Sequence, residues 1–183
     1  MQGKGTGGTT QTFGCDQRIS KSSAVAEALG TLDELDSFLG ICKVKSAKLD
    51  LGVGSQFKTF GELTHWIQEN LFIIQAQVAG ASKVMDGSKI TIMEGIIDNI
   101  EKVLPPIKTF FIAGGDEISA TFDFGRTLAR RAERRVIAVS DEGPSKISAE
   151  ALSFMNRLSS LLYALARLSN AKSGITEESP NYK

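Results

Sequence analysis

The residues with the clearest chemical potential belong to one arginine-rich run. Between positions 124 and 136 the chain holds five arginines and one glutamate. At about 100° per residue the run predicts one helix, whose apolar arc is formed by Phe122, Ala129, Ala132 and Val136. Arg126, Arg130 and Glu133 follow the edge of that arc at spacings of four and three. The pattern therefore places two guanidinium groups and a carboxylate beside a buried surface.

A guanidinium at that edge loses hydration unless a carboxylate or a phosphate replaces it. One interpretation is pairing of Glu133 with arginines of its own helix. The other is an anion-binding site, framed by the double-glycine turn that ends at Asp116, which can cap the helix. Arg131 and Arg135 are expected to face solvent on either interpretation.

A second candidate site is the N-terminal segment, residues 1–22, which is rich in glycine and threonine and is expected to be flexible. Such residues present backbone N–H groups and hydroxyls that suit a phosphate cradle, and they equally suit a disordered terminus. The segment is not a Walker A loop, because no strand precedes it and no Gly-Lys-Ser/Thr ends it.

Two further polar groups leave alternatives open. A stripe on the last predicted helix is either the wall of a site or the wet side of an amphipathic helix; it consists of Asn156, Ser160, Tyr163, Arg167 and Asn170. Asp33 is surrounded by the small residues Ala26, Gly30, Ser37 and Gly40. It is either a solvated surface carboxylate or the partner of a cation that approaches closely.

The hydrophobic periodicity predicts an all-α protein, an antiparallel five-helix bundle of the up-down, ferritin-like type. The expected helices cover about 21–45, 60–82, 91–104, a span that ends near Asp141, and 148–172. At 183 residues one core suffices. We expect a bundle domain over 23–172 and a disordered tail over 173–183.

Composition excludes several classes of protein. Basic and acidic side chains both number 21, and the isoelectric point is about 6.6, which does not favour a nucleic-acid or membrane surface. A single histidine, His65, does not suit sites built on paired histidines. Cys15 and Cys42 are expected to be reduced, and no signal-peptide core or 18-residue apolar run is evident. We therefore expect a cytoplasmic protein.

Four stretches together resemble one enzyme family. The segment from Phe110 through the double glycine to Arg134 is similar to the central motif of the trimeric PduO-type ATP:cob(I)alamin adenosyltransferases. Residues 5–10 (GTGGTT) resemble the N-terminal Gly-Asp-x-Gly-x-Thr nucleotide motif of that family. Residues 21–35 resemble its stretch that begins with lysine and ends in Gly-x-x-Asp-Glu-Leu, and residues 154–159 resemble its Phe-x-Asn-Arg-Leu-Ser.

The resemblance implies a reaction and a site. The 5'-deoxyadenosyl group of ATP moves to cob(I)alamin, triphosphate leaves, and Mg²⁺ accompanies ATP without a separate protein metal site. Arg126 would pair with Asp33 across a subunit boundary of a homotrimer, and Phe110 would lie against the lower face of the corrin ring. The implied ATP-binding residues are Gly5, Thr6, Gly8, Thr10, Lys21, Arg130, Glu133 and Asn156.

Departures from the family pattern keep two alternatives open. Thr6 replaces an aspartate, Ser23 and Val25 replace an aspartate and an arginine, and Ala113 replaces a proline. One alternative is a bundle that binds ATP or cobalamin without catalysis. The other is a structural bundle that meets a partner through its arginine-rich face. Docking of a reductase partner is a further open point.

Overall fold

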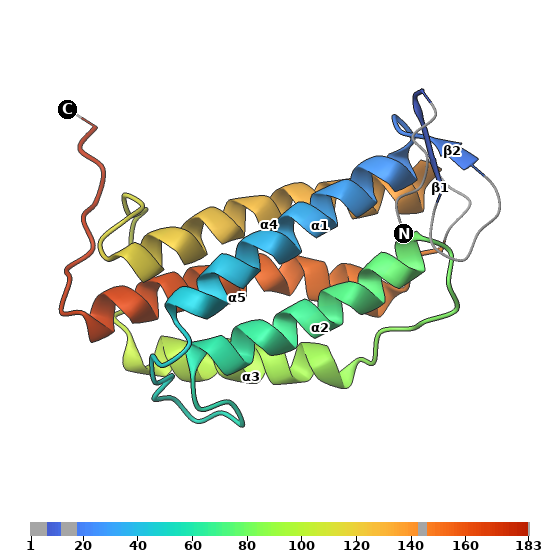
Figure 1. Ribbon diagram of the computed structural model, residues 1–183. Helices are drawn as coiled ribbons and strands as arrows, with labels where there is room; N and C mark the ends of the chain where they lie inside the picture. The colour runs from blue at the N-terminus through green and yellow to red at the C-terminus, as the bar shows by residue number, and fades with distance from the viewer. Residues whose placement is uncertain (1–6, 12–17, 143–145, 183) are drawn as a thin grey trace.

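The structure, a computed structural model, describes residues 7–11, 18–142 and 146–182 of the chain. Figure 1 shows five helices that lie side by side and a small two-stranded sheet at one end. The helices are α1 (Ala24–Lys45), α2 (Phe60–Val78), α3 (Ser88–Val103), α4 (Glu117–Glu142) and α5 (Ala149–Lys172). The expected mostly helical class, and the five expected helices, are confirmed.

The helices pack through one continuous core. Helix α4 lies against both α1 and α5, α1 also contacts α2, and α3 packs on α5. Helix α5 is buried most completely, since most of its residues from Leu158 onward are inaccessible to solvent. Aromatic rings join the helices, with Phe60 of α2 beside Phe122 of α4 and Trp66 of α2 beside Phe154 of α5. The predicted apolar arc of α4 is fully buried.

Polar caps explain where the helices begin. Ser23, Thr59 and Ser148 each accept a hydrogen bond from the backbone N–H three residues on, which satisfies one of the free donors of the first turn. Helix α1 therefore begins at Ala24 and not at Lys21. Helix α2 ends at Val78, four residues before the predicted end, and Gly80 follows with φ of 89°.

The expected N-terminal loop contains secondary structure. Strands β1 (Thr9–Gln11) and β2 (Arg18–Ser20) pair in antiparallel register. The backbone N–H of Lys21 donates to the carbonyl of Gly8 over 2.9 Å, and Arg18 Nε donates to Thr9 Oγ1. The prediction of a loop is therefore wrong for these strands, because local antiparallel pairing gives regular structure to a sequence that has no helical periodicity.

The C-terminal tail makes contacts that the sequence did not reveal. The N–H of Ile112 donates to the carbonyl of Glu178 over 2.8 Å, and the N–H of Ile175 donates to the carbonyl of Asn170. The tail therefore runs back beside the 105–116 loop that joins α3 to α4 (Figure 1).

His65 and Cys42 have the environments that the sequence predicts. His65 is exposed near the start of α2. Cys42 is a free thiol in the core, and burial raises its pKa to about 11; Cys15 lies outside the described residues. Within the part of the chain that the structure describes, no helix is long and apolar enough to span a bilayer.

The start of α2 generates a stability prediction. A Cβ at Gly61 would lie 2.7 Å from Cα of Ala47, so Gly61→Ala should lower the free energy of unfolding by about 1–3 kcal/mol. A Cβ added at Gly95 in α3 would meet open space, so Gly95→Ala should raise the free energy of unfolding by about 0.5–1 kcal/mol. Urea denaturation of both variants checks this, and equal effects would contradict the close approach of α2 to Ala47.

Candidate functional site

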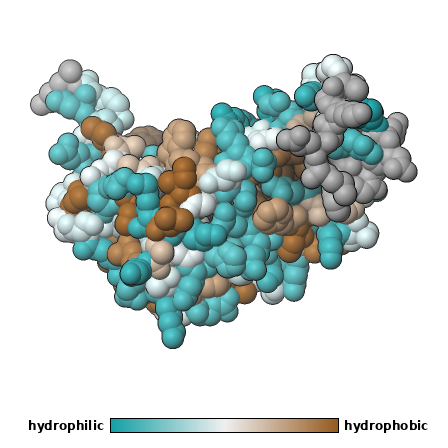
Figure 2. Space-filling model, viewed as in Figure 1, coloured by the Kyte–Doolittle hydropathy of each residue, from teal (hydrophilic) through white to brown (hydrophobic). Residues whose placement is uncertain are grey.

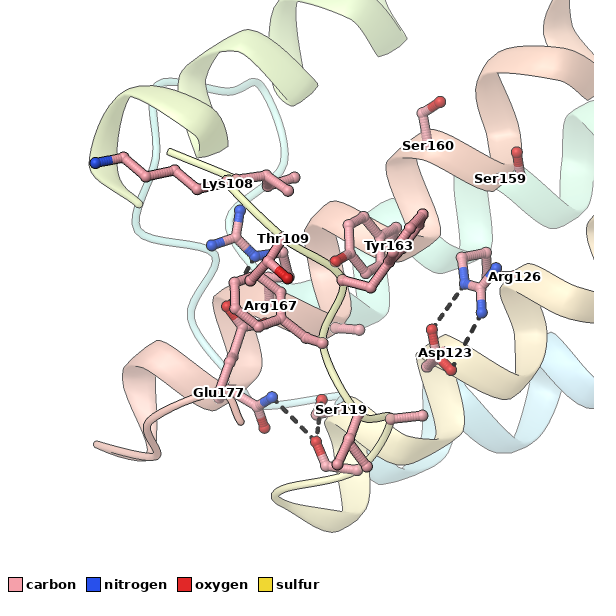
Figure 3. A pocket seen from close by; sticks show the side chains of 18 of the residues that line it. Lys108, Thr109, Ser119, Asp123, Arg126, Ser159, Ser160, Tyr163, Arg167 and Glu177 are labelled. Carbon is pink, nitrogen blue, oxygen red and sulfur yellow. Dashed lines mark hydrogen bonds and ion pairs between the residues drawn. The ribbon is translucent and has the colours of Figure 1, made fainter. Parts of the chain in front are cut away.

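One cavity of about 590 Å³ lies between α4, α5 and the 105–116 loop. Its wall combines the whole segment from Ile107 to Gly114 with polar side chains of both helices and with Glu177 of the tail. Figure 3 shows Asp123 and Arg126 reaching toward the cavity from one helix and Tyr163 and Arg167 from another. Three segments distant in sequence therefore meet at one site.

The polar stripe of α5 lines this cavity. Ser160, Tyr163, Arg167 and Asn170 are all part of its wall, and Arg167 and Asn170 are only 4% and 5% exposed. The alternative of a solvated amphipathic face is therefore wrong for this part of the helix. Burial raises the pKa of Tyr163, which keeps its hydroxyl protonated and able to donate a hydrogen bond at neutral pH.

Arg126 is held in the cavity wall by two neighbours. Its Nε lies 2.7 Å from Asp123 Oδ1, and a second contact of 3.4 Å joins the other oxygen (Figure 3). The guanidinium carbon also lies 5.9 Å from the ring centre of Tyr163. Within the single chain Arg126 thus pairs with its own helix, and Asp33 is an exposed residue of α1. The predicted Arg126–Asp33 pair concerns a second copy of the chain and stays a prediction.

Arg130 and Glu133 behave differently from each other. Arg130 lines the cavity, is exposed, and forms no ion pair within the described residues. Glu133 accepts a hydrogen bond from Asn156 Nδ2 of α5 over 2.9 Å. The pairing of Glu133 within its own helix is therefore not what the structure contains. Three of the residues assigned to ATP, Arg130, Glu133 and Asn156, thus lie together on one face of α4 and α5.

The expectation that Arg131 and Arg135 face solvent is confirmed, since both side chains are exposed, and the structure adds an ion pair to each. Arg131 pairs with Glu34, and Arg135 lies 3.4 Å from Glu27, both on α1. These arginines are at the surface, but α1 packs along α4 and supplies carboxylates on that side. The outer charges of the arginine-rich run therefore serve helix packing and leave Arg126 and Arg130 for the cavity.

The two phenylalanines of the 105–116 loop have distinct environments. Phe110 lines the cavity with 79% of its surface exposed. Phe111 is half-buried, and its ring centre lies 5.3 Å from the guanidinium of Arg167. Phe110 is thus the more exposed of the two rings, and Phe111 packs on Arg167; that Phe110 meets a corrin ring stays a prediction.

The double-glycine turn is fixed by α5. Asn170 Nδ2 donates to the carbonyl of Gly114, and its Oδ1 accepts from the N–H of Asp116. Gly115 has φ of 117°, and a Cβ there would lie 2.2 Å from Asn170 Oδ1, so only glycine fits. Asp116 caps α4, as predicted, because its Oδ1 accepts from the N–H of Ser119 over 2.6 Å.

Three more of the predicted ATP residues, Gly8, Thr10 and Lys21, lie in or next to the β1–β2 hairpin. The β1–β2 hairpin brings Gly8 beside Lys21 and leaves Thr10 half-buried opposite Ile19. Gly5 and Thr6 lie outside the described residues. The hairpin stands where α4 ends and α5 begins, at the opposite end of the helices from the 105–116 loop (Figure 1).

Sequence reasoning missed two members of the cavity wall. Asp123 could have been found, because it precedes Arg126 by three residues and falls on the same helical face. Glu177, which pairs with Arg167 over 2.9 Å, gave no comparable signal because it lies beyond the last helix. Among the described residues, His, Cys, Asp and Glu side chains form no group of three or more suited to a metal ion.

Comparison with known proteins addresses the chain as a whole. A family model described as cobalamin adenosyltransferase matches residues 1–169. The corrinoid adenosyltransferase PduO of Citrobacter freundii is 37% identical over 170 residues, which cover 89% of this chain and 47% of that protein. The corrinoid adenosyltransferase of Bacillus subtilis is 34% identical over 174 residues, or 93% of this chain and 86% of that one.

A solved structure is similar in fold. A variant of the PduO-type ATP:corrinoid adenosyltransferase of Lactobacillus reuteri, complexed with cobalamin and ATP, matches with a TM-score of 0.82 and 26% identity, covering 95% of this chain and 94% of that one. The chain spans about half the length of the PduO proteins of Citrobacter freundii and Salmonella typhimurium, since 47% of each is covered. On its sequence and its fold, this chain belongs to the cobalamin adenosyltransferase family.

Proposed function

We propose that this protein transfers the 5'-deoxyadenosyl group of ATP to cob(I)alamin, with release of triphosphate. The observation that carries the proposal is the cavity between α4, α5 and the 105–116 loop. It combines an exposed apolar ring at Phe110 with the guanidinium of Arg130, which has no ion-pair partner among the residues that the structure describes. A flat apolar macrocycle and an anionic triphosphate need these two surfaces next to each other.

In this reaction the protein itself forms no covalent bond to either substrate. The cobalt of cob(I)alamin is the nucleophile, so a new Co–C5' bond forms as the C5'–O bond to triphosphate breaks, and the electron pair of that bond leaves with the phosphate oxygen. The protein holds C5' in line with cobalt. Arg130 and Lys21 stabilise the charge that develops on triphosphate, and Asn156, held by Glu133, orients the nucleotide.

Mg²⁺ is proposed to enter with ATP, because phosphate oxygens are the ligands that it prefers. The hairpin residues Gly8 and Thr10, with Gly5 and Thr6 before them, are proposed to cradle the phosphates through backbone N–H groups and hydroxyls. Thr6 offers a hydroxyl where the family has a carboxylate. Ser23, which replaces another family aspartate, caps α1 by accepting a hydrogen bond from the N–H of Ala26.

We further propose a homotrimer of antiparallel up-down five-helix bundles, in which Asp33 of one subunit pairs with Arg126 of the next. Exposed apolar side chains on α1 and α4 support an interface, because Ile41, Val44 and Phe124 are 48%, 75% and 54% accessible. Figure 2 shows apolar surface over the part of the molecule where α1 ends. Burying such a patch against a second copy is favourable.

An anaerobic assay tests the activity. Purified protein is mixed with MgATP and chemically reduced cob(I)alamin, and adenosylcobalamin is followed by its visible spectrum together with release of triphosphate. Product above a protein-free control supports the transferase. Binding of ATP or cobalamin without product would favour a binding protein, and no binding at all would favour a structural bundle.

The two halves of the site should separate in kinetics. Asn156→Ala removes a proposed nucleotide contact and should raise KM for ATP about tenfold, with KM for cobalamin nearly unchanged. Arg126→Ala and Asp33→Ala should mainly raise KM for cobalamin, because they open the proposed interfacial pair. Steady-state kinetics with each substrate varied in turn measures this; equal effects of all three variants on both substrates would contradict the division.

The two neighbouring phenylalanines provide a matched pair. Phe110→Ala should lower kcat with cobalamin at least about tenfold and leave the melting temperature nearly unchanged, because the ring is exposed. Phe111→Ala should lower the melting temperature, since its ring packs on Arg167. Thermal denaturation and the adenosylation assay distinguish the two, and the assignment fails if Phe111→Ala alone abolishes turnover in a stable protein.

A further inference from the structure

Arg167 is an arginine buried in the wall of the cavity. Its side chain is 5% exposed, and a guanidinium at that depth requires partners that replace its hydration. It has three. Nε donates to Glu177 Oε2 over 2.9 Å, a terminal nitrogen donates to the carbonyl of Pro105 over 3.0 Å, and the ring of Phe111 lies over its face.

Those three partners come from two different segments. Pro105 and Phe111 both belong to the 105–116 loop, which carries Phe110, whereas Glu177 belongs to the C-terminal tail. Of the three partners, only Glu177 carries a negative charge, and its own side chain is only 17% exposed. The charge that allows Arg167 to remain buried is thus supplied from outside the helices.

The tail also holds the loop directly. The carbonyl of Glu178 accepts the N–H of Ile112. Two consecutive tail residues therefore hold the loop just after the exposed ring, Glu177 through Arg167 and its contact with Phe111, and Glu178 through the backbone of Ile112. Two residues further along, Asn170 holds the loop at Gly114. The position of Phe110 therefore depends on contacts that Phe110 does not itself make.

We infer that Glu177 is a positioning residue, which through Arg167 keeps the 105–112 part of the loop, and with it Phe110, in the place where the corrinoid is received. The identity of the ligand in this inference rests on the proposed function, whereas the role of Glu177 in holding the loop is independent of it. The tail thereby becomes part of the cobalamin half of the site, while the ATP half, at Glu133 and Asn156, has no contact with it among the interactions of the described residues.

The chain offers a matched control for the experiment. Glu178 is the adjacent residue, is exposed, and its side chain makes no hydrogen bond or ion pair within the described residues. Glu177→Ala and Glu178→Ala remove the same charge from the same segment, and both retain the backbone carbonyl that binds Ile112. A variant that retains an acceptor for Arg167, Glu177→Gln, should fall between wild type and Glu177→Ala.

The first measurement needs no ligand. In amide hydrogen exchange of the full chain, Glu177→Ala should accelerate exchange at Ile112 and its neighbours by about tenfold or more, the scale expected when a buried charge loses its partner. Glu178→Ala should leave exchange there unchanged. Equal protection in the two variants would overturn the inference, whatever reaction the protein catalyses.

The second measurement is kinetic. Glu177→Ala should raise KM for cobalamin by about tenfold and change KM for ATP by less than about twofold, whereas Glu178→Ala should resemble wild type. A general loss of structure would raise both values, and that result would overturn a positioning role. If wild type forms no adenosylcobalamin, the proposed function fails, and the exchange experiment alone still decides whether Glu177 holds the loop.

Discussion

The packing of α4 against α5 is the constraint from which the site follows. Because the apolar arc of α4 is buried, the residues at its edge face the space beside α5. Asp123, Arg126 and Arg130 line the cavity there, and Glu133 accepts a hydrogen bond from Asn156 of α5. The polar stripe of α5 faces the same space for the same reason. Two amphipathic helices with polar residues at matching intervals thus form a polar wall to which neither β1 nor β2 contributes a residue.

The two ends of this wall are completed by different means. At the N-terminal end a short hairpin brings Gly8 to Lys21 through one backbone hydrogen bond. At the other end the loop with Phe110 is fixed by side chains of α5, because a loop without regular structure cannot satisfy its own backbone groups. The hairpin end is thus held mainly by backbone pairing, whereas the loop end depends on side chains of α5.

Local periodicity accounts for what the sequence predicted well. The helices, the cap at Asp116 and the edge position of Arg126 and Arg130 depend on residues within one or two turns of one another, and these predictions are confirmed. The environments of Arg131 and Arg135 depend on α1, which lies almost a hundred positions away in the chain, and the wheel alone could not supply that neighbour. The strand pairing at Thr9–Gln11 escaped prediction for a different reason: its partner strand is close in sequence, but neither three-residue strand has a hydrophobic pattern of its own.

Burial of charge is the part of the site that a sequence reveals least. From the sequence, a stripe that contains Tyr163 and Arg167 fits the solvated side of a helix as well as the buried wall of a site. Which of these forms depends on whether a carboxylate reaches the arginine. That carboxylate is Glu177, in a segment whose composition suggests disorder. Because the free energy of burying Arg167 depends on a residue beyond the last helix, the tail and the cavity wall form one unit: removing the tail's charge alters the loop even though every helix remains intact.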